Sequence, residues 1–110
     1  MTTLVESTGR FDNESRRLIR KFRSLRNELD QLKSQLQRGD RPGDRLAGIG
    51  YEAYKVRLPN RSARRGKSGG FRVIYQERSG RLILLLLIYS KTERADIPDD
   101  VIIRVIEEAD

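Results

Sequence analysis

The sequence predicts an α+β fold in which a helical hairpin is followed by a small antiparallel sheet and a C-terminal helix. Apolar residues from Leu18 to Leu36 recur at steps of four and three, which is the period of a helix. Three later segments alternate between apolar and polar residues or are apolar throughout, as strands are. These segments are residues 54–58, 71–76 and 82–89. A chain of 110 residues fits one domain, residues 1–110.

The first element expected is a short edge strand over residues 2–6, where Thr, Leu and Val favour extended backbone. Gly9 interrupts this segment. Asp12 follows as a suitable N-cap for the first helix, because its carboxylate can accept hydrogen bonds from the first turn.

The helical period continues without Gly or Pro until Gly39. A single helix over residues 12–37 would be about 39 Å long, whereas a compact chain of this size is roughly 34 Å across. We therefore expect a break into a hairpin, with the second helix beginning at Ser24, a residue that can cap. One straight coiled-coil helix is the alternative.

The strands follow a loop over residues 39–50, which contains four glycines and one proline. The segment 54–58 is predicted to be a half-buried strand, because Lys55 and Arg57 alternate with apolar residues. Its apolar residues are Tyr54, Val56 and Leu58.

A basic loop over residues 61–70 leads into the next strand, in which Arg72 alternates with Phe71 and Val73. A turn over residues 78–80 then connects to residues 82–89. This last segment is apolar on both faces, which is typical of a central strand. The short turn predicts that the two strands pair antiparallel.

The C-terminal helix is predicted to begin near Pro98, since proline is tolerated in a first helical turn. Asp99 and Asp100 suit the positive end of a helix dipole. The apolar stripe consists of Val101, Ile102, Val105, Ile106 and Ala109. The acidic last turn has the wrong sign for the negative end of the dipole, so we expect this end to fray.

Charge is distributed unevenly along the chain, whose 23 basic and 16 acidic residues give a net charge of +7. Residues 55–72 contain seven basic residues and no acid, whereas residues 96–110 contain six acids and one arginine. An uninterrupted basic segment indicates a partner with a phosphate backbone. A solvated surface without function is the alternative interpretation.

The absence of cysteine and histidine limits the chemistry that this chain can perform. Thiolate catalysis, disulfides and the commonest metal ligands are excluded, so any catalysis must use Lys, Arg, Tyr or carboxylates. No spacing typical of metal ligands is visible, and we expect neither a metal nor a cofactor. The longest apolar run, residues 82–89, is far shorter than the roughly 20 residues that span a bilayer. We expect a soluble cytoplasmic protein with no membrane partner.

Three segments resemble the core of RelE/ParE-superfamily toxins of type II toxin–antitoxin systems. They are Tyr54-Lys-Val-Arg-Leu58, Gly66-Lys-Ser-Gly-Gly-Phe-Arg-Val-Ile-Tyr75 and Ile88-Tyr-Ser-Lys-Thr-Glu-Arg-Ala-Asp-Ile97. The Gly-Lys-Ser-Gly-Gly-Phe-Arg element is the most specific of them, and with its flanking helices the resemblance covers nearly the whole chain. It implies a RelE-like fold: a helical hairpin packed on one face of a curved antiparallel sheet whose other face is open.

The RelE-like branch implies a ribosome-dependent endoribonuclease that needs no metal and inhibits translation by cleaving messenger RNA. In that reaction a ribose 2′-hydroxyl attacks the adjacent phosphate, and basic side chains stabilise the charge that accumulates on its oxygens. Two alternatives remain open: a ParE-like inhibitor of DNA gyrase without nuclease activity, and a non-catalytic nucleic-acid-binding module. The expected partners are the ribosome with its messenger RNA and a cognate antitoxin, with which the toxin would form a higher hetero-oligomer.

The resemblance also implies roles for individual residues. Arg72 matches the central phosphate-contacting arginine, and Lys67 and Lys91 are the other candidate catalytic residues. Lys67 could act as general base if cationic neighbours lower its pKa. The expected RNA-binding residues are Lys55, Arg57, Arg61, Arg64, Arg65 and Arg94.

The sequence departs from the nuclease branch at two places. Thr92 stands where that branch has a second arginine, and Pro98 stands near the position of its tyrosine acid. The general acid is therefore unassigned. Tyr89 and Tyr75 could replace the missing tyrosine acid only in the sense that they have the same side chain. Tyrosines in apolar strands are more often core residues.

Overall fold

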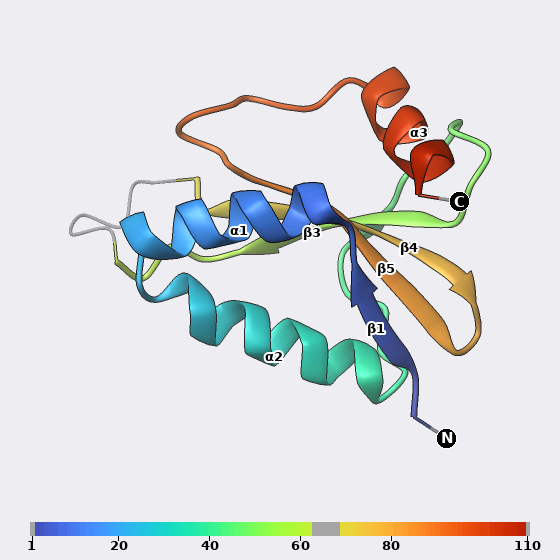
Figure 1. Cartoon of the computed structure of the whole chain (residues 1–110), viewed down its shortest axis with the longest axis horizontal. Helices are drawn as coiled ribbons and strands as arrows, with labels where there is room; N and C mark the ends of the chain where they lie inside the picture. The colour runs from blue at the N-terminus through green and yellow to red at the C-terminus, as the bar shows by residue number, and fades with distance from the viewer. Residues whose placement is uncertain (1, 63–68, 110) are drawn as a thin grey trace.

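The computed structural model describes residues 2–62 and 69–109 of the chain. Three helices and a five-stranded sheet are formed by these residues, with the strands in the order β1-β5-β4-β3-β2 (Figure 1). The elements are β1 Leu4–Ser7, α1 Gly9–Lys21, α2 Leu25–Gln37, β2 Asp44–Arg45, β3 Ala53–Leu58, β4 Phe71–Ser79, β5 Leu82–Ser90 and α3 Asp99–Glu108. The α+β class is therefore confirmed.

The N-terminal strand was expected, but its pairing was not. β1 pairs in parallel with β5, Leu4 opposite Leu82, so the sheet is mixed and the prediction of a purely antiparallel sheet is wrong. A strand, not the helical hairpin, is the first element. A long connection through two helices separates β1 from the other strands, and connections of this length permit parallel pairing, which a tight turn does not.

The first helix begins earlier than predicted, because Thr8 and not Asp12 is its N-cap. The Thr8 hydroxyl accepts a hydrogen bond from the backbone N–H of Phe11 at 3.0 Å and donates one to the carbonyl of Leu86 at 2.9 Å. The same side chain thus caps α1 and attaches its start to β5. Gly9 lies within the first turn and does not interrupt the helix.

The predicted break between the helices is confirmed, and a single straight helix is wrong. α1 ends at Lys21 and α2 begins after Ser24. The Ser24 hydroxyl makes no capping hydrogen bond; it accepts one from the Ser62 hydroxyl at 2.8 Å. The turn of the hairpin is therefore attached to the chain that follows β3.

Two hydrophobic clusters lie on opposite faces of the sheet. The first contains Leu18 of α1, Leu32 of α2 and the alternate strand residues Val56, Val73 and Ile83. The second contains Ile49, Ala53, Ile74 and Tyr89 together with Ile102, Val105 and Ile106 of α3. The second face is thus partly covered by α3 and not open throughout, as the resemblance implied. It remains accessible where Lys55, Arg57 and Arg72 lie.

A β-bulge interrupts the pairing of β4 with β5. Ile74 pairs with Leu87 and Tyr75 pairs with Leu85, so Leu86 has no partner in the register. An extra residue shifts the alternation of side chains. Leu86 and Leu87 consequently both belong to the second cluster, whereas Leu85 and Ile88 belong to the first. The predicted antiparallel pairing and the burial of β5 on both faces are confirmed.

A short strand, β2, lies within the segment that was predicted to be a loop. Asp44 pairs with Lys55 of β3 in this two-residue ladder. Gly43, with φ of +94°, directly precedes β2 in the chain. Its backbone lies so close to β3 that a Cβ there would be 2.4 Å from the carbonyl oxygen of Lys55. Glycine alone has the conformation and the small size for this approach. It brings Asp44 alongside the basic residues of β3.

The end of α3 is held more firmly than its acidic residues suggest. Arg78 of β4 donates a hydrogen bond to the carbonyl of Ile106 at 3.1 Å, and the hydroxyl of Tyr51 donates one to Glu107 at 3.2 Å. Arg78 supplies the positive charge that a helix C-terminus favours. Helices of the described residues are all too short and too polar to cross a membrane.

Candidate nucleic-acid interface

Three strands bring the predicted phosphate-contacting residues to one row of the second face. Arg57 of β3 pairs with Arg72 of β4, which in turn pairs with Tyr89 of β5. Side chains of paired residues lie on the same face, and residues two apart along a strand share a face. Lys55 therefore points to the same side as Arg57 and Arg72.

These residues line a groove of about 500 Å³ at the β2 edge of the sheet. Lys55, Arg57 and Arg72 are its basic residues, and Asp44 is the acid among the described residues that line it. Gly43 and Val56 complete the lining. Three positive charges in one groove provide strong attraction for a phosphate group and can contact its oxygens directly.

Asp96 was not predicted to belong to the site, but it forms an ion pair with Lys55. The Lys55 ammonium donates a hydrogen bond to the Asp96 carboxylate at 2.9 Å. This hydrogen bond raises the pKa of Lys55 above its usual value and lowers the pKa of Asp96, which also accepts a hydrogen bond from the backbone N–H of Ile97. Lys55 is therefore charged at neutral pH and is unsuited to act as a general base.

The two candidate tyrosines lie on opposite faces of the sheet. Tyr89 lies on the face of Arg72, and its hydroxyl donates a weak hydrogen bond to Asp96 at 3.4 Å. Tyr75 faces the helices, is fully buried, and donates to the carbonyl of Pro42 at 2.6 Å. Burial raises the pKa of both hydroxyls above the usual value. Tyr75 is thus a core residue, and Tyr89 is the tyrosine adjacent to the cluster.

The guanidinium of Arg72 is positioned by the backbone that leads into β4. Its Nη1 atom donates hydrogen bonds to the carbonyl oxygens of Gly69 and Phe71. Gly70 has a φ of +70°, and a Cβ there would lie 2.3 Å from the carbonyl oxygen of Leu58. Gly70 therefore allows the chain to pass β3 closely, and the carbonyl of Gly69 helps to hold Arg72 at the groove.

Lys91 lies beside this entry to β4 but is engaged elsewhere. Its backbone N–H donates to the carbonyl of Gly70 at 2.9 Å, and its ammonium donates to the carbonyl of Ala95. Its aliphatic stem covers Gly69, where a Cβ would lie 2.5 Å from Cγ of Lys91. The backbone of Lys91 is thus close to the start of β4, which carries Arg72, but its ammonium is bound by a carbonyl of the segment that follows β5.

The remaining predicted residues do not join the cluster of Lys55, Arg57 and Arg72. Arg61 donates a hydrogen bond at 3.0 Å to Glu28, a buried acid of α2 on the helical side of the sheet. Arg64, Arg65 and Lys67 lie outside the described residues. Arg94 lines a second groove, on the other side of β5.

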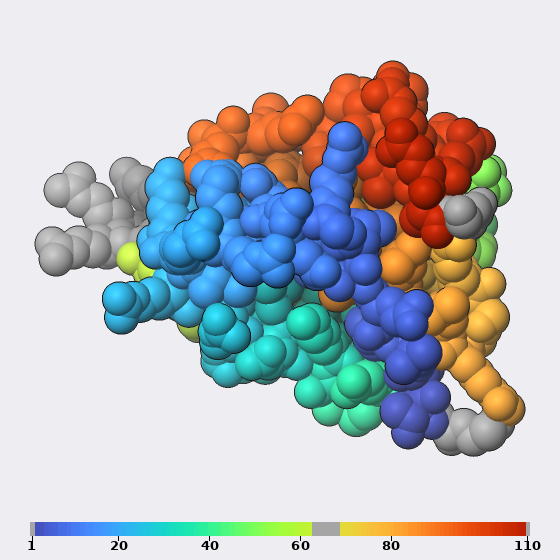
Figure 2. All heavy atoms as spheres, in the orientation of Figure 1, coloured from blue at the N-terminus to red at the C-terminus, as the bar shows by residue number. Residues whose placement is uncertain are grey.

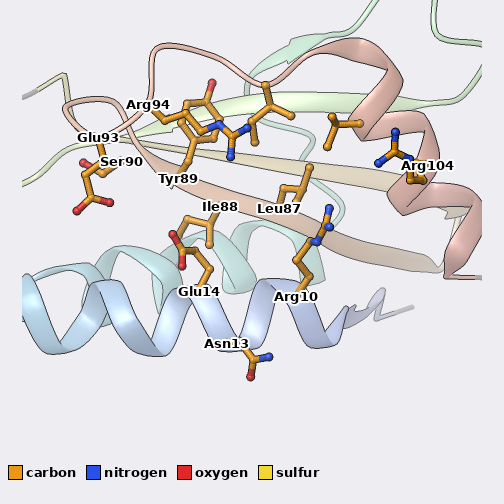
Figure 3. Close-up of a pocket in the computed structure, with 12 residues that line it drawn as sticks. Arg10, Asn13, Glu14, Leu87, Ile88, Tyr89, Ser90, Glu93, Arg94 and Arg104 are labelled. Carbon is orange, nitrogen blue, oxygen red and sulfur yellow. The ribbon is translucent and has the colours of Figure 1, made fainter.

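This second groove was not predicted from the sequence. It has a volume of about 700 Å³ and lies between α1, β5 and α3 (Figure 3). Arg10 comes to it from α1, Arg94 from the segment between β5 and α3, and Arg104 from α3. No spacing in the sequence indicates it, because these arginines are brought together only by the packing of α1 and α3 beside β5.

An ion-pair network joins α1 to the segment that follows β5. Glu93 accepts hydrogen bonds from Arg17 at 2.6 Å and from Lys21 at 2.8 Å, and Arg17 also binds Glu14 at 2.8 Å. These bonds lower the pKa of Glu93 to about 2 and lower the pKa of Glu14 as well. In Figure 2 the atoms of α1 meet those of this segment directly. The network fixes the segment that carries Asp96.

The fold resembles that of a known toxin. No protein-family model matches the chain, and no curated protein sequence matches it. Among solved structures, the free state of a double arginine-to-alanine mutant of the E. coli toxin RelE is similar, with a TM-score of 0.59 and 18% sequence identity. The similarity covers 86% of this chain and 90% of that chain. The chain therefore has the RelE fold.

Proposed function

We propose that this chain is the toxin of a type II toxin–antitoxin system and cleaves messenger RNA on the ribosome. The observation that carries the proposal is the convergence of Lys55, Arg57 and Arg72 in one groove on a sheet of the RelE fold. Arg72, which backbone hydrogen bonds hold in place, and the neighbouring Arg57 and Lys55 suit a reaction in which a phosphate gains negative charge. We place the protein in the cytoplasm, because ribosomes and messenger RNA occur there.

The proposed reaction is transfer of a phosphodiester to the neighbouring ribose. The 2′-oxygen bonds to phosphorus, the bond from phosphorus to the 5′-oxygen breaks, and the products are a 2′,3′-cyclic phosphate and a 5′-hydroxyl. Arg72 contacts the phosphate oxygens, and its two backbone hydrogen bonds keep it oriented before the substrate arrives. Arg57, exposed on the neighbouring strand, contacts the flanking phosphate.

Asp44 is the residue that we assign as general base. Asp44 is the carboxylate that lines the groove, whereas Lys55 is bound to Asp96, which raises the pKa of the lysine. Asp44 and Lys55 are paired across β2 and β3, so their side chains lie side by side at the groove. The 2′-hydroxyl proton passes to Asp44, and the departing 5′-oxygen takes a proton from the Lys55 ammonium. Exchange with water restores both groups.

The proposed partners follow from the charge of this surface. The ribosome and its messenger RNA are the targets, and the basic groove stays accessible until a partner covers it. We propose that an antitoxin with acidic side chains covers Lys55, Arg57 and Arg72 and that the pair assembles into a higher hetero-oligomer. Lys67, a candidate catalytic lysine, belongs to the same basic segment of the sequence.

Primer extension on messenger RNA after brief expression tests the proposal. Discrete new 5′ ends within coding regions are expected for the parent protein. Asp44→Asn should reduce their yield by about 10²–10⁴-fold, the typical contribution of a general base. Asp30→Asn, which removes an exposed acid of α2, is the matched control.

The two parts of the proposal fail in different ways. If the parent protein produces no new 5′ ends in translating cells, nuclease activity is wrong. If the parent cleaves and Asp44→Asn cleaves equally well, only the assignment of the base is wrong, and Lys67 becomes the leading candidate.

Inhibition of DNA gyrase is the second candidate function, and Pro98 is the observation that favours it. This residue, near the expected position of the tyrosine acid, is the N-cap of α3 and has no proton to donate. A supercoiling assay with purified gyrase distinguishes the two functions. Inhibition of supercoiling together with intact messenger RNA would support this alternative.

A further inference from the structure

The outer edge of β5 is paired along only half of its length. β1 pairs with Leu82–Leu85 and ends at Ser7, after which Thr8 starts α1. Within residues 2–62 and 69–109, no strand pairs with the continuation of this edge from Leu87 to Ser90. An open strand edge presents backbone N–H and C=O groups to any extended chain of suitable sequence.

The second groove follows this open edge. Four consecutive residues of β5, from Leu87 to Ser90, line it. Because side chains alternate between faces, a groove lined by consecutive residues must follow the backbone and not one face. Ile88 is buried in the first cluster and Tyr89 in the second, so the strand presents mainly its backbone here.

The rim of the groove carries unbalanced positive charge. Arg10 reaches it from α1, Arg94 from the segment after β5 and Arg104 from α3 (Figure 3). Among the described residues, Arg10 and Arg94 make no ion pair, and Arg104 lies 4.0 Å from Asp100. The acids of the rim, Glu14 and Glu93, are already bound by Arg17, and Glu93 also by Lys21.

We propose that this groove binds an acidic, extended segment of a partner polypeptide, which adds to the sheet as a strand beside residues 87–90. Backbone hydrogen bonds to β5 give the segment its extended conformation, and its carboxylates contact Arg10, Arg94 and Arg104. The bound strand occupies the position that β1 would reach if it continued beyond Ser7. The proposal does not depend on nuclease activity, because the groove lies on the other side of β5 from Lys55 and Arg57.

A peptide fits this groove better than RNA does. A strand edge offers donors and acceptors at the spacing of another peptide backbone. Single-stranded RNA is bound by aromatic rings on which its bases stack. Tyr89 is the aromatic residue among those that line the groove, and it is 4% exposed, so its ring is not available for stacking.

The test is selection from a random dodecapeptide library displayed on phage, with the purified chain as target. The selected peptides should be rich in Asp and Glu at alternate positions, separated by β-branched residues. Changing Arg10→Glu, Arg94→Glu and Arg104→Glu together should weaken their binding at least about tenfold, the loss expected for one charge-assisted contact. The matched control changes Arg20→Glu, Arg23→Glu and Arg26→Glu, three exposed arginines of the helical hairpin.

Amide hydrogen exchange locates the bound peptide. On addition of a selected peptide, the amides of residues 87–90, which line the groove, should exchange more slowly. The proposal is overturned if the selected peptides lack acids, bind both triple variants equally, or leave these amides unprotected. Displacement of the peptides by single-stranded RNA that itself needs the three arginines would assign the groove to nucleic acid instead.

Discussion

The Asp96 carboxylate lies 2.9 Å from the Lys55 ammonium, although 41 residues separate them. A residue after β5 therefore raises the pKa of a lysine on β3. Asp96→Asn should bring the pKa of Lys55 back toward its usual value, because this hydrogen bond is the main cause of the upward shift. NMR titration of the lysine side chain measures the change. Asp99→Asn, an exposed acid at the start of α3, is the control, and an unchanged pKa in Asp96→Asn would refute the pairing.

The Glu93 network predicts how stability depends on pH. The pKa of Glu93 is lowered to about 2 by Arg17 and Lys21, below the value of about 4.3 for an unfolded glutamate. A lowered pKa stabilises the folded state at pH values above the pKa of the unfolded state. This stabilisation is lost as the pH falls from about 4.3 toward 2. Thermal unfolding at pH 6 and pH 3 measures it.

Glu93→Gln should remove this pH dependence and lower the free energy of unfolding at pH 6 by about 1 kcal/mol, the upper range for an exposed ion pair. Glu108→Gln, in the last turn of α3, provides the control. A parent and a Glu93→Gln variant with parallel pH profiles would contradict the prediction.

Arg61 is predicted to stabilise the fold more than it binds RNA. It is bound to Glu28, whose side chain is 6% exposed, so Arg61→Ala would leave a buried carboxylate without its partner. We expect a loss of about 1–3 kcal/mol in the free energy of unfolding, measured by urea denaturation. Adding Glu28→Leu should recover most of that loss.

The comparison with Arg57→Ala decides between the two roles. Arg57 is exposed in the groove, so its removal should weaken RNA binding and reduce the slope of the salt dependence by about 0.7 without loss of stability. The opposite pattern, with Arg61→Ala weakening RNA binding at full stability, would assign Arg61 to the interface.

Adjacent glycines before β4 are predicted to differ sharply in their tolerance of a methyl group. Gly70→Ala places Cβ 2.3 Å from a backbone oxygen of Leu58 in a conformation that disfavours alanine, so it should cost roughly 1–3 kcal/mol of stability or more. Gly69→Ala meets the side chain of Lys91, which can move. Urea denaturation of both variants tests this, and equal losses would be inconsistent with the structure.

Arg72→Lys should lose most of the cleavage activity while the protein stays folded. One ammonium cannot replace a planar guanidinium that contacts two phosphate oxygens. Primer extension measures cleavage, and circular dichroism monitors folding. A variant that cleaves as well as the parent would remove Arg72 from the site.

Local patterns were sufficient to predict most of the elements. The spacing of Leu18 to Leu36 predicted two helices, and the alternation around Lys55 and Arg72 predicted which faces their strands bury. The N-cap was placed wrongly because Asp12 and Thr8 are equally suitable by type. What distinguishes Thr8 is its hydrogen bond to Leu86, which no local pattern contains.

The site was predicted less completely, because its parts meet only through long-range pairing. The clustering of Arg57 with Arg72 follows from the register of β3 with β4, and the sequence motif indicated it. Asp44 and Asp96 were missed: Asp44 lies in the segment that was predicted to be a loop, and Asp96 follows β5 in a segment for which no contact with Lys55 was expected. The groove of Arg10, Arg94 and Arg104 depends on helix packing alone.

The parallel pairing of β1 with β5 constrains the order in which the protein can be built during its own synthesis. β1 is translated before the other strands of the sheet, yet Leu4 has no partner until Leu82 has been made. Pairing β1 with β5 closes a long loop, which costs chain entropy and slows folding. Until β5 has been made, the helices that follow β1 have no sheet on which to bury their apolar faces. Asp96 completes the cluster later still. A chain proposed to act on translating ribosomes therefore assembles its own site only after residues through Asp96 have been translated.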